Sequence, residues 1–579
     1  MKTIVATLNA KYIHTSLALR YLKAYAEPEF PVEIKEFTIK DDPLDIASKL
    51  YMKKPDVIGF SCYIWNIRET ISVISILKKI SPDTIIVVGG PEVTYDSEEW
   101  IDRLPEVDVI VRGEGEQTFK SLLYAIKHQD PFDMIPGITY AKNGEVQVNP
   151  PAPKLELDRI PSPYRFKEDK PDLPKRITYV ETSRGCPFRC QFCLSSIEFG
   201  VRYFNIDRMK DDLSYLMENG AKTIKFIDRT FNLDKTYALE IFDFLIHHHR
   251  PGNVFQFEIT ADIMKPEVMD FINRNAPEGL FRFEIGVQST NDQTNRLIKR
   301  WQDFGKLSRT VNMIREGGKV VQHLDLIAGL PEEDYDSFKK TFNDVFELKP
   351  EELQLGFLKM LRGTGLRIQA EQWGYQYMDE APYEVLSNHV LSFDDVTKIK
   401  QVEDILEKYW NKQFFNHTVP YITDHVFPTP FDFFQEFGIY WHKKGWNKIG
   451  HQFTDLFRRL HQFLKEKSVS SLDIIEGLMY IDFYRNFKQK PHKLWNHSIT
   501  LDEKQTIYDK LWEIYPFASY GFQKRDMRKH VLVHHTTFDV QTYLGKGEII
   551  TKPGWMLVIY HPKKDEPIFD FVCSSDEVR

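Results

Sequence analysis

Three of the chain's five cysteines stand close together in the segment TSRGCPFRCQFC. Cys186, Cys190 and Cys193 have the spacing C-x3-C-x2-C. Three thiolates in one loop can ligate three irons of a cubane cluster and leave the fourth iron open to a small molecule. A structural zinc site normally takes four protein ligands, and the next histidine is His247, so zinc is the lesser alternative. Haem attachment through C-x-x-C-H is excluded, because Leu194 follows the last cysteine.

The composition narrows the class of protein. Of the 579 residues, 42% are hydrophobic and 14% aromatic, which excludes a disordered chain. No apolar run approaches the roughly 18 residues of a membrane span, and the segment MKTIVATLNAKYIHTSL lacks the features of a secretory signal. An odd number of cysteines, five in all, predicts a reducing compartment, the cytoplasm. The net charge of −8 argues against a protein that coats nucleic acid.

Alternating strand and helix patterns surround the cysteine segment and must position it. Strands are expected over residues 176–182, 223–228, 255–260, 281–287, 322–327 and 352–358, with helices between them. Six such units predict a partial (β/α)6 barrel over residues 176–375. The cysteines then follow the first barrel strand, at the end of the barrel where ligands bind.

This arrangement resembles the radical S-adenosylmethionine (SAM) superfamily. The resemblance rests on the cysteine spacing, on Phe192 before the last cysteine and on the barrel that follows. It implies a 4Fe-4S cluster whose open iron chelates the methionine part of SAM, and a 5′-deoxyadenosyl radical formed by one-electron reduction. The family often has a Gly-Gly-Glu sequence at the second strand; here the run from Phe226 to Asp228 stands in its place. The resemblance and the polar strand ends together indicate these SAM-binding candidates: Phe192, Phe226, Asp228, Glu258, Thr260, Glu284, Gln288 and Asp325.

Residues 1–130 alternate strands and helices in the manner of a doubly wound, Rossmann-like α/β sheet. Residues 56–62 and 84–89 are apolar runs typical of parallel strands buried on both faces. Glycine turns follow two strands, at Gly89–Gly90 and at Gly113–Gly115, where backbone can approach a flat ligand. Neither turn matches G-x-G-x-x-G, so a dinucleotide site is the lesser alternative.

Together with the sequences SCYIWN and RGEGE, this layout resembles the cobalamin-binding domain that precedes the barrel in cobalamin-dependent radical SAM enzymes. The sequence D-x-H-x-x-G, whose histidine ligates cobalt in other cobalamin proteins, is absent. We therefore expect Tyr63 or Trp65 near cobalt; packing at the sheet edge is the alternative, and cobalt ligation by His14 is a minor one. The resemblance implies these cobalamin-binding candidates: Asn9, Tyr12, Ser61, Tyr63, Trp65, Asn66, Gly89, Gly90, Pro91, Glu92, Gly113, Glu114 and Gly115.

Two further segments complete the expected organisation. Residues 131–175 are rich in proline and predict a linker with one hairpin near residues 142–144. Residues 376–579 are dense in aromatic residues and predict a mainly helical domain that ends in a small sheet. The resemblance assigns no function to this last domain.

The resemblance thus implies a cobalamin-dependent radical SAM enzyme, which we expect to methylate an unactivated carbon. A rearrangement with the same cofactors is the close alternative, and a cobalamin or redox sensor without catalysis is a further one. Methylthiotransfer is disfavoured, because those enzymes bind a second cluster through three N-terminal cysteines and this segment has only Cys62. The expected partners are an unknown substrate and an electron donor such as flavodoxin or ferredoxin, with no membrane and no nucleic acid.

Overall fold

The computed structural model describes residues 1–197, 200–491, 494 and 501–573. It divides into two compact units, Met1–Pro350 with Leu355–Val396, and Glu351–Gln354 with Thr397–Arg579. The predicted class, α/β segments followed by a mainly helical region, is confirmed. None of the described helices combines the length and the apolar character that a bilayer crossing requires.

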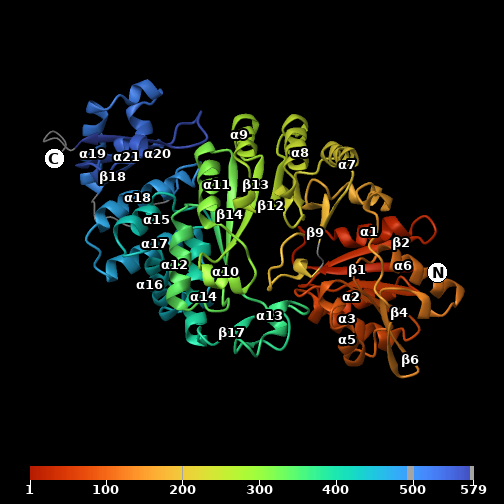
Figure 1. The fold of residues 1–579 in the computed structure, drawn as a ribbon. Helices are drawn as coiled ribbons and strands as arrows, with labels where there is room; N and C mark the ends of the chain where they lie inside the picture. Colours follow the sequence, from red (N-terminus) through yellow and green to blue (C-terminus); the bar gives the residue numbers. More distant parts are fainter. Residues whose placement is uncertain (198–199, 492–493, 495–500, 574–579) are drawn as a thin grey trace. The chain divides into compact units, whose positions relative to one another are not determined.

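The first unit begins with a seven-stranded sheet in the order β2-β1-β3-β4-β5-β6-β7 (Figure 1). Strands β1 to β5 run parallel. Their bounds are β1 Thr3–Asn9, β2 Val32–Thr38, β3 Val57–Ser61, β4 Ile85–Gly89 and β5 Val109–Val111. Successive strand residues point to opposite faces, so both faces carry an apolar core. Helices α1 (Leu17–Ala26) and α6 (Glu116–His128) cover one face. Helices α2 (Pro43–Tyr51), α3 (Ile67–Ile80), α4 (Pro91–Thr94) and α5 (Ser97–Arg103) cover the other.

The expected hairpin belongs to this sheet and not to a free linker. Strands β6 (Ile138–Lys142) and β7 (Glu145–Val148) pair antiparallel and extend the sheet from β5. The prolines around the hairpin conceal only its place in the first sheet, where Ile138 and Tyr140 are buried in the core. The first sheet thus continues past residue 130.

The barrel consists of a six-stranded sheet in the order β15-β14-β13-β12-β11-β8. Its strands are β8 Thr178–Val180, β11 Thr223–Phe226, β12 Val254–Ile259, β13 Phe281–Gln288, β14 Val320–Ala328 and β15 Glu352–Phe357, one for each predicted strand. The helices are α7 Ile206–Glu218, α8 Lys235–His248, α9 Pro266–Asn275, α10 Asp292–Leu297, α11 Phe304–Gly317 and α12 Tyr335–Phe346. Figure 1 shows α8, α9 and α11 beside strands β12 to β14. Strand residues alternate between fully and partly buried, because one side faces helices and the other faces the barrel lumen.

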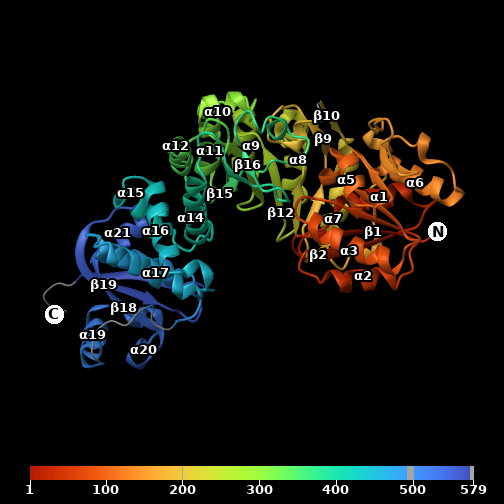
Figure 2. The ribbon, with the colours of Figure 1, turned by 90° about the horizontal axis from the view of Figure 1, so that it is seen from below.

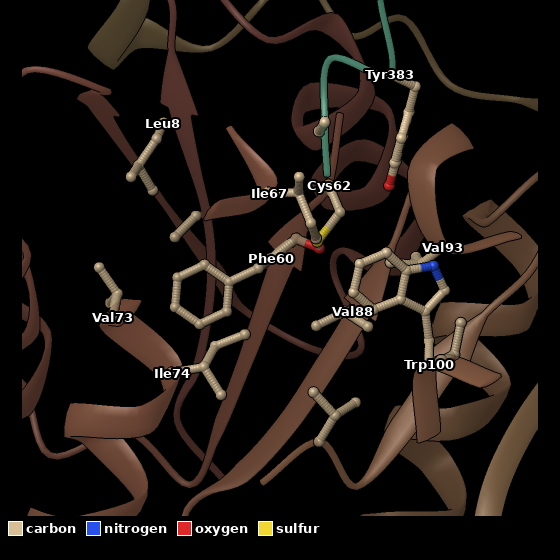
Figure 3. Close-up of a cluster of buried hydrophobic side chains, with 14 of the residues drawn as sticks. Leu8, Phe60, Cys62, Ile67, Val73, Ile74, Val88, Val93, Trp100 and Tyr383 are labelled. Carbon is tan, nitrogen blue, oxygen red and sulfur yellow. Dashed lines mark hydrogen bonds between the residues drawn. The ribbon is translucent and has the colours of Figure 1, made fainter. Parts of the chain in front are cut away.

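The segment after the barrel returns to the first sheet. It contains α13 (Gly365–Ile368), β16 (Gln376–Tyr377) and β17 (Val385–Ser387). Tyr383 packs in one core cluster with Cys62, Val93 and Trp100 of the first sheet and its helices (Figure 3). The compact first unit therefore extends to Val396, about twenty residues beyond the predicted barrel end at 375.

The second unit is helical and ends in an antiparallel sheet. Its helices are α14 Phe393–Tyr409, α15 Thr418–His425, α16 Pro430–Lys443, α17 Phe453–Glu466, α18 Leu472–Arg485, α19 Leu501–Ile514, α20 Met527–His530 and α21 Val540–Lys546. The strands are β18 Val531–Phe538, β19 Thr551–Ile559 and β20 Ile568–Cys573. Figure 2 shows α19 and α20 next to β18. The aromatic residues fill the core; Trp441 is fully buried, and the rings of Phe437 and Phe463 stack at 4.7 Å.

Candidate functional site

The three clustered cysteines lie on a hairpin at the end of the first barrel strand. Cys186 ends strand β9 (Ser183–Cys186), which pairs antiparallel with β10 (Gly200–Tyr203). Burial raises the pKa of the Cys186 and Cys190 thiols, and the neighbouring Cys193 thiol raises both further. The Ser196 hydroxyl donates to the carbonyl groups of Cys190 (2.8 Å) and Cys193 (2.7 Å), which holds the loop around the sulfur atoms. The loop thus carries three soft donors within eight residues of sequence, although the described residues contain no group of three such side chains already placed around a metal ion.

Asp228 fixes the start of this loop. Its carboxylate accepts from the Thr182 backbone N–H (3.1 Å), from the Thr182 hydroxyl (2.6 Å) and from the Ser183 hydroxyl (2.6 Å). Asp228 is 1% exposed, and burial raises its pKa. Its side chain therefore supports β9 directly; whether it also touches SAM stays a prediction.

Three other SAM-binding candidates face the barrel lumen. The Glu284 carboxylate pairs with Lys225 at 2.6 Å. The Asp325 carboxylate lies 3.1 Å from the imidazole of His323. Burial raises the pKa of Glu258. The lumen is thus charged, with two of the three carboxylates next to basic side chains.

The remaining SAM-binding candidates have mainly structural contacts. Phe226 is fully buried and stacks on Phe257 at 4.3 Å, on the helix side of the sheet. The Thr260 backbone exchanges two hydrogen bonds with the Asn232 amide, at 2.8 and 2.9 Å. Gln288 has a φ of +69° beside a register shift in β13. Phe192 packs partly buried against the core of the first sheet.

A cavity of about 730 Å³ opens between the first sheet and the cysteine hairpin. The first sheet contributes residues that follow the ends of β1, β3, β4 and β5. Among them are the predicted cobalamin-binding residues Asn9, Ser61, Tyr63, Trp65, Gly89, Gly90, Pro91, Gly113, Glu114 and Gly115. The barrel contributes Tyr179, Glu181, Ser183, Arg184, Gly185, Leu194, Ser195, Ile227 and Arg229. Its volume is in the range of small-molecule and cofactor sites. The eight SAM-binding candidates are not part of this lining as the described residues define it.

Glycine shapes the floor of the cavity. Gly90 has a φ of +108°, and a Cβ there would stand 2.6 Å from the Cys62 carbonyl oxygen. No other residue fits that turn without displacing backbone. Gly113 has a φ of +71° with open space beside it. Backbone is thus exposed to a large flat ligand at two turns.

Two aromatic rings form one edge of the cavity. The rings of Tyr63 and Trp65 stack at 4.3 Å with planes 8° apart. Trp65 is 46% exposed. A stacked pair with an open face can pack against a conjugated ring system.

Three predicted cobalamin-binding residues point away from the cavity lining. Asn66 is fully buried and bonds the loop after β3, since its amide donates to the Leu8 and Ser61 carbonyl oxygens, each at 3.1 Å. Glu92 is turned inward by α4 and accepts from the Tyr383 hydroxyl. Tyr12 is 61% exposed and lies against the Arg176 guanidinium. Position after a strand end does not decide which way a side chain points.

Charged residues that the sequence analysis missed join the two walls. Arg184 of β9 donates to Glu181 (3.0 Å) and to Glu116 (2.6 Å) at the start of α6. Arg202 of β10 pairs with Glu114. Burial raises the pKa of Glu181 to about 7. The acidic pair in RGEGE and the arginine in TSRGC are the only sequence signals for this network, and their separation of nearly 70 residues hides it.

Comparison with known families assigns three segments. Residues 3–123 match the B12 binding domain, and residues 180–345 match the Radical SAM superfamily. The chain carries a B12-binding domain followed by a radical SAM domain. Residues 371–558 match a family described as Protein of unknown function (DUF4080).

Relatives with similar sequences include methyltransferases and a cyclase. The uncharacterized methyltransferase PH0819 of Pyrococcus horikoshii is 36% identical over 237 residues, 39% of this chain and 51% of that protein. The cobalamin-dependent radical SAM methyltransferase TokK of Streptomyces tokunonensis is 30% identical, over 31% of this chain and 28% of its own length. The anaerobic magnesium-protoporphyrin IX monomethyl ester cyclase of Rubrivivax gelatinosus is 25% identical, over 57% of this chain and 61% of its own. The matched part of the chain thus covers between 28% and 61% of the length of these three relatives.

Two solved structures resemble the fold of this chain over most of its length. The methyltransferase TsrM of Kitasatospora setae, with tryptophan and a SAM analogue bound, has a TM-score of 0.56 at 17% identity, over 66% of this chain and 80% of its own. OxsB, with aqua-cobalamin and SAM bound, has a TM-score of 0.55 at 17% identity, over 83% of this chain and 79% of its own. At these identities the likeness shows the fold.

The residues present fit the cofactors of both domains. Three thiols in one loop suit a cluster with an open iron. The glycine turns and the aromatic edge suit a corrin, because they line the cavity with backbone and with two flat rings. In the B12-binding domain, His14 lies on the cavity wall and its Nδ1 is 2.7 Å from the Tyr179 hydroxyl.

Proposed function

We propose that this chain is a cobalamin-dependent radical SAM enzyme that transfers a methyl group to an unactivated carbon. A 4Fe-4S cluster, SAM and cobalamin are its cofactors. A one-electron donor such as flavodoxin or ferredoxin supplies electrons in the cytoplasm. The named methyltransferases among the relatives support this assignment.

One observation carries the proposal: a single cavity is lined both by the glycine turns of the B12-binding domain and by residues that flank the cluster cysteines in sequence. Its lining includes the glycine turn at Gly89–Gly90 and also the hairpin residues Ser183 and Arg184, just before the first cluster cysteine. A corrin on one wall and a SAM-bound cluster on the other would face the same enclosed substrate. Such proximity would let both cofactors act on one substrate.

The chain's own residues bind, orient and exclude water. Cys186, Cys190 and Cys193 hold the cluster, and the bound cofactors supply the radical and the methyl group. Asp228 fixes the hairpin through its three hydrogen bonds. Arg184, through Glu116, ties the hairpin to the B12-binding domain and fixes the width of the cavity.

The test separates the two cofactors. The chain is purified anaerobically with cobalamin, reconstituted with iron and sulfide, and compared with Cys190→Ala. We expect the wild type to show both visible spectra and to cleave SAM, and Cys190→Ala to lose the cluster absorption and SAM cleavage while keeping cobalamin. Full iron content and full cleavage in Cys190→Ala would overturn the cluster assignment.

A ring-forming or rearranging reaction with the same cofactors is the second candidate. The cyclase relative favours it, because its similarity extends over more of this chain than that of the methyltransferases. Product mass distinguishes the two, since only methylation adds one CH2, whereas a rearrangement keeps the mass and an oxidative ring closure removes hydrogen. A sensor without catalysis predicts no SAM cleavage with any reductant.

A further inference from the structure

Arg300 lies against the cluster loop although it is more than a hundred residues away in sequence. It follows α10, and its Nη1 donates to the Cys190 Sγ at 3.9 Å. Its Nε donates to the Gln302 amide oxygen at 3.0 Å, and its Nη2 donates to the Gly286 carbonyl oxygen. The guanidinium is thus oriented on two sides by neutral acceptors and presents its third edge to the sulfur.

Backbone hydrogen bonds fix this approach from both directions. The Gln191 N–H, next to Cys190, donates to the Ile298 carbonyl oxygen at 2.9 Å. The Arg300 N–H donates to the Asn295 carbonyl oxygen at 2.8 Å. The contact between guanidinium and sulfur therefore follows from how the two loops are joined, and does not depend on one flexible side chain.

The charge of Arg300 is available to the sulfur. Over the described ranges 1–197, 200–491, 494 and 501–573, its hydrogen-bond acceptors are an amide, a carbonyl and a thiol. Arg184, at the other side of the hairpin, differs, because Glu181 and Glu116 neutralise it. Of these two cations, Arg300 is the one that contacts a cluster ligand.

We propose that Arg300 makes the cluster easier to reduce by donating a charged hydrogen bond to Cys190. This rests on the proposed function, because it assumes that the cluster binds. Hydrogen bonds and positive charge at the ligating sulfurs stabilise the more negative, reduced form of an iron–sulfur cluster. The step is a one-electron transfer: a low-potential donor such as reduced flavodoxin loses one electron, the cluster gains it, and no proton moves. Arg300 acts through Cys190 and is a positioning residue.

The test is a redox titration of the reconstituted full-length protein followed by electron paramagnetic resonance. In Arg300→Met we expect the ratio of reduced to oxidised cluster at a fixed potential to fall about tenfold, which is about 59 mV for a one-electron couple. Arg300→Lys keeps the positive charge, so we expect a smaller fall in the ratio of reduced to oxidised cluster for this variant. Arg296→Met is the matched control, because Arg296 lies on α10 and donates to the Asp292 carbonyl oxygen away from the cysteines. It should titrate like the wild type.

Equal ratios in Arg300→Met and the wild type, within about twofold, would overturn the proposal. So would an equal fall in Arg296→Met, since that would be a general effect of charge. If Arg300→Met does not assemble a cluster, the same titration is carried out on Gln302→Ala, which removes only an acceptor that orients Arg300. A fall in the ratio of reduced to oxidised cluster of less than about tenfold then supports the proposal. An unchanged ratio overturns it. A wild type without a cluster or without SAM cleavage would refute the proposed function itself.

Discussion

The two walls of the cavity, one from the B12-binding domain and one from the radical SAM domain, differ in the groups that line them. The B12-binding domain presents backbone, glycine and two stacked rings, at Gly90, Gly113, Tyr63 and Trp65. The radical SAM domain presents charged side chains, such as Arg184, that are held in networks. One wall fits a ligand by shape, and the other positions charge. Mutations in the two walls should therefore impair different properties: cobalamin affinity for the B12-binding wall and cluster content for the radical SAM wall.

The difference extends beneath each wall. Under the B12-binding wall, Cys62 and Tyr383 belong to an apolar core that excludes water (Figure 3). In the radical SAM domain, Asp228 and Glu333 are buried carboxylates that hold loops by hydrogen bonds. Steric changes at the glycine turns should affect mainly the first wall, and loss of the Asp228 or Glu333 carboxylate should affect mainly the radical SAM domain.

Gly90→Val should give the largest effect and should be confined to the B12-binding wall. Its Cβ would overlap the Cys62 carbonyl oxygen, and the positive φ adds strain of about 1–3 kcal/mol. We expect cobalamin affinity to fall by more than about 100-fold, which corresponds to roughly 3 kcal/mol. Iron content after reconstitution should be unchanged.

The measurement for Gly90→Val is a cobalamin titration by absorbance, with iron and sulfide assays on the same samples. Gly144→Val is the matched control, because Gly144 has a φ of +84° at a hairpin tip with open space around it. Wild-type cobalamin affinity in Gly90→Val would contradict the assignment of this turn.

Asp228→Ala should reduce cluster binding by the radical SAM domain and leave cobalamin binding by the B12-binding domain unchanged. It leaves the Thr182 N–H and the Thr182 and Ser183 hydroxyls without their acceptor, at a cost of about 2–4 kcal/mol. We expect the iron bound per chain to fall by about fivefold to tenfold, while cobalamin affinity stays within about twofold. Asp234→Ala removes a helix cap of α8 nearby and should change neither quantity. If Asp228→Ala lost cobalamin affinity by the same factor as iron, the two walls would not be independent.

The sequence predicted the elements of both walls better than the directions of their side chains. The cysteine spacing and the apolar runs locate the hairpin and all six barrel strands, because period and composition are local properties. Asn66 and Glu92 were expected to bind cobalamin, but they lie outside the cavity lining: Asn66 bonds the backbone of its own loop, and Glu92 accepts from the distant Tyr383 hydroxyl. Arg184 and Arg300 were missed, since their partners are distant in sequence. Only tertiary packing brings such charges together.

Glu333 should make the stability of the radical SAM domain sensitive to pH. It is fully buried, accepts from the Ser289 and Thr341 hydroxyls, and burial raises its pKa from 4.5 to about 7. The folded state therefore binds a proton between these values that the unfolded state has lost, so the free energy of unfolding falls as pH rises through this window. The full loss is on the order of 3 kcal/mol above the folded pKa.

Glu333→Gln keeps the shape and removes the titration. The melting temperature of the wild type should fall relative to that of Glu333→Gln as pH rises from about 5 to about 8, measured by calorimetry. Cobalamin affinity should not follow this pH dependence, because the B12-binding wall relies on shape. Parallel melting curves across that range would show that Glu333 does not titrate there.

Trp65→Ala should give the smallest effect and tests how much the aromatic edge contributes to the B12-binding wall. A stacked aromatic contact contributes about 0.5–1.5 kcal/mol, so cobalamin affinity should fall by roughly twofold to tenfold. Trp65→Phe keeps an aromatic ring stacked on Tyr63, so it should retain most of the wild-type cobalamin affinity. Trp301→Ala is the control, since Trp301 is 74% exposed on the barrel side. A loss as large as that of Gly90→Val would mean that the stacked rings, and not the glycine backbone, dominate recognition on this wall.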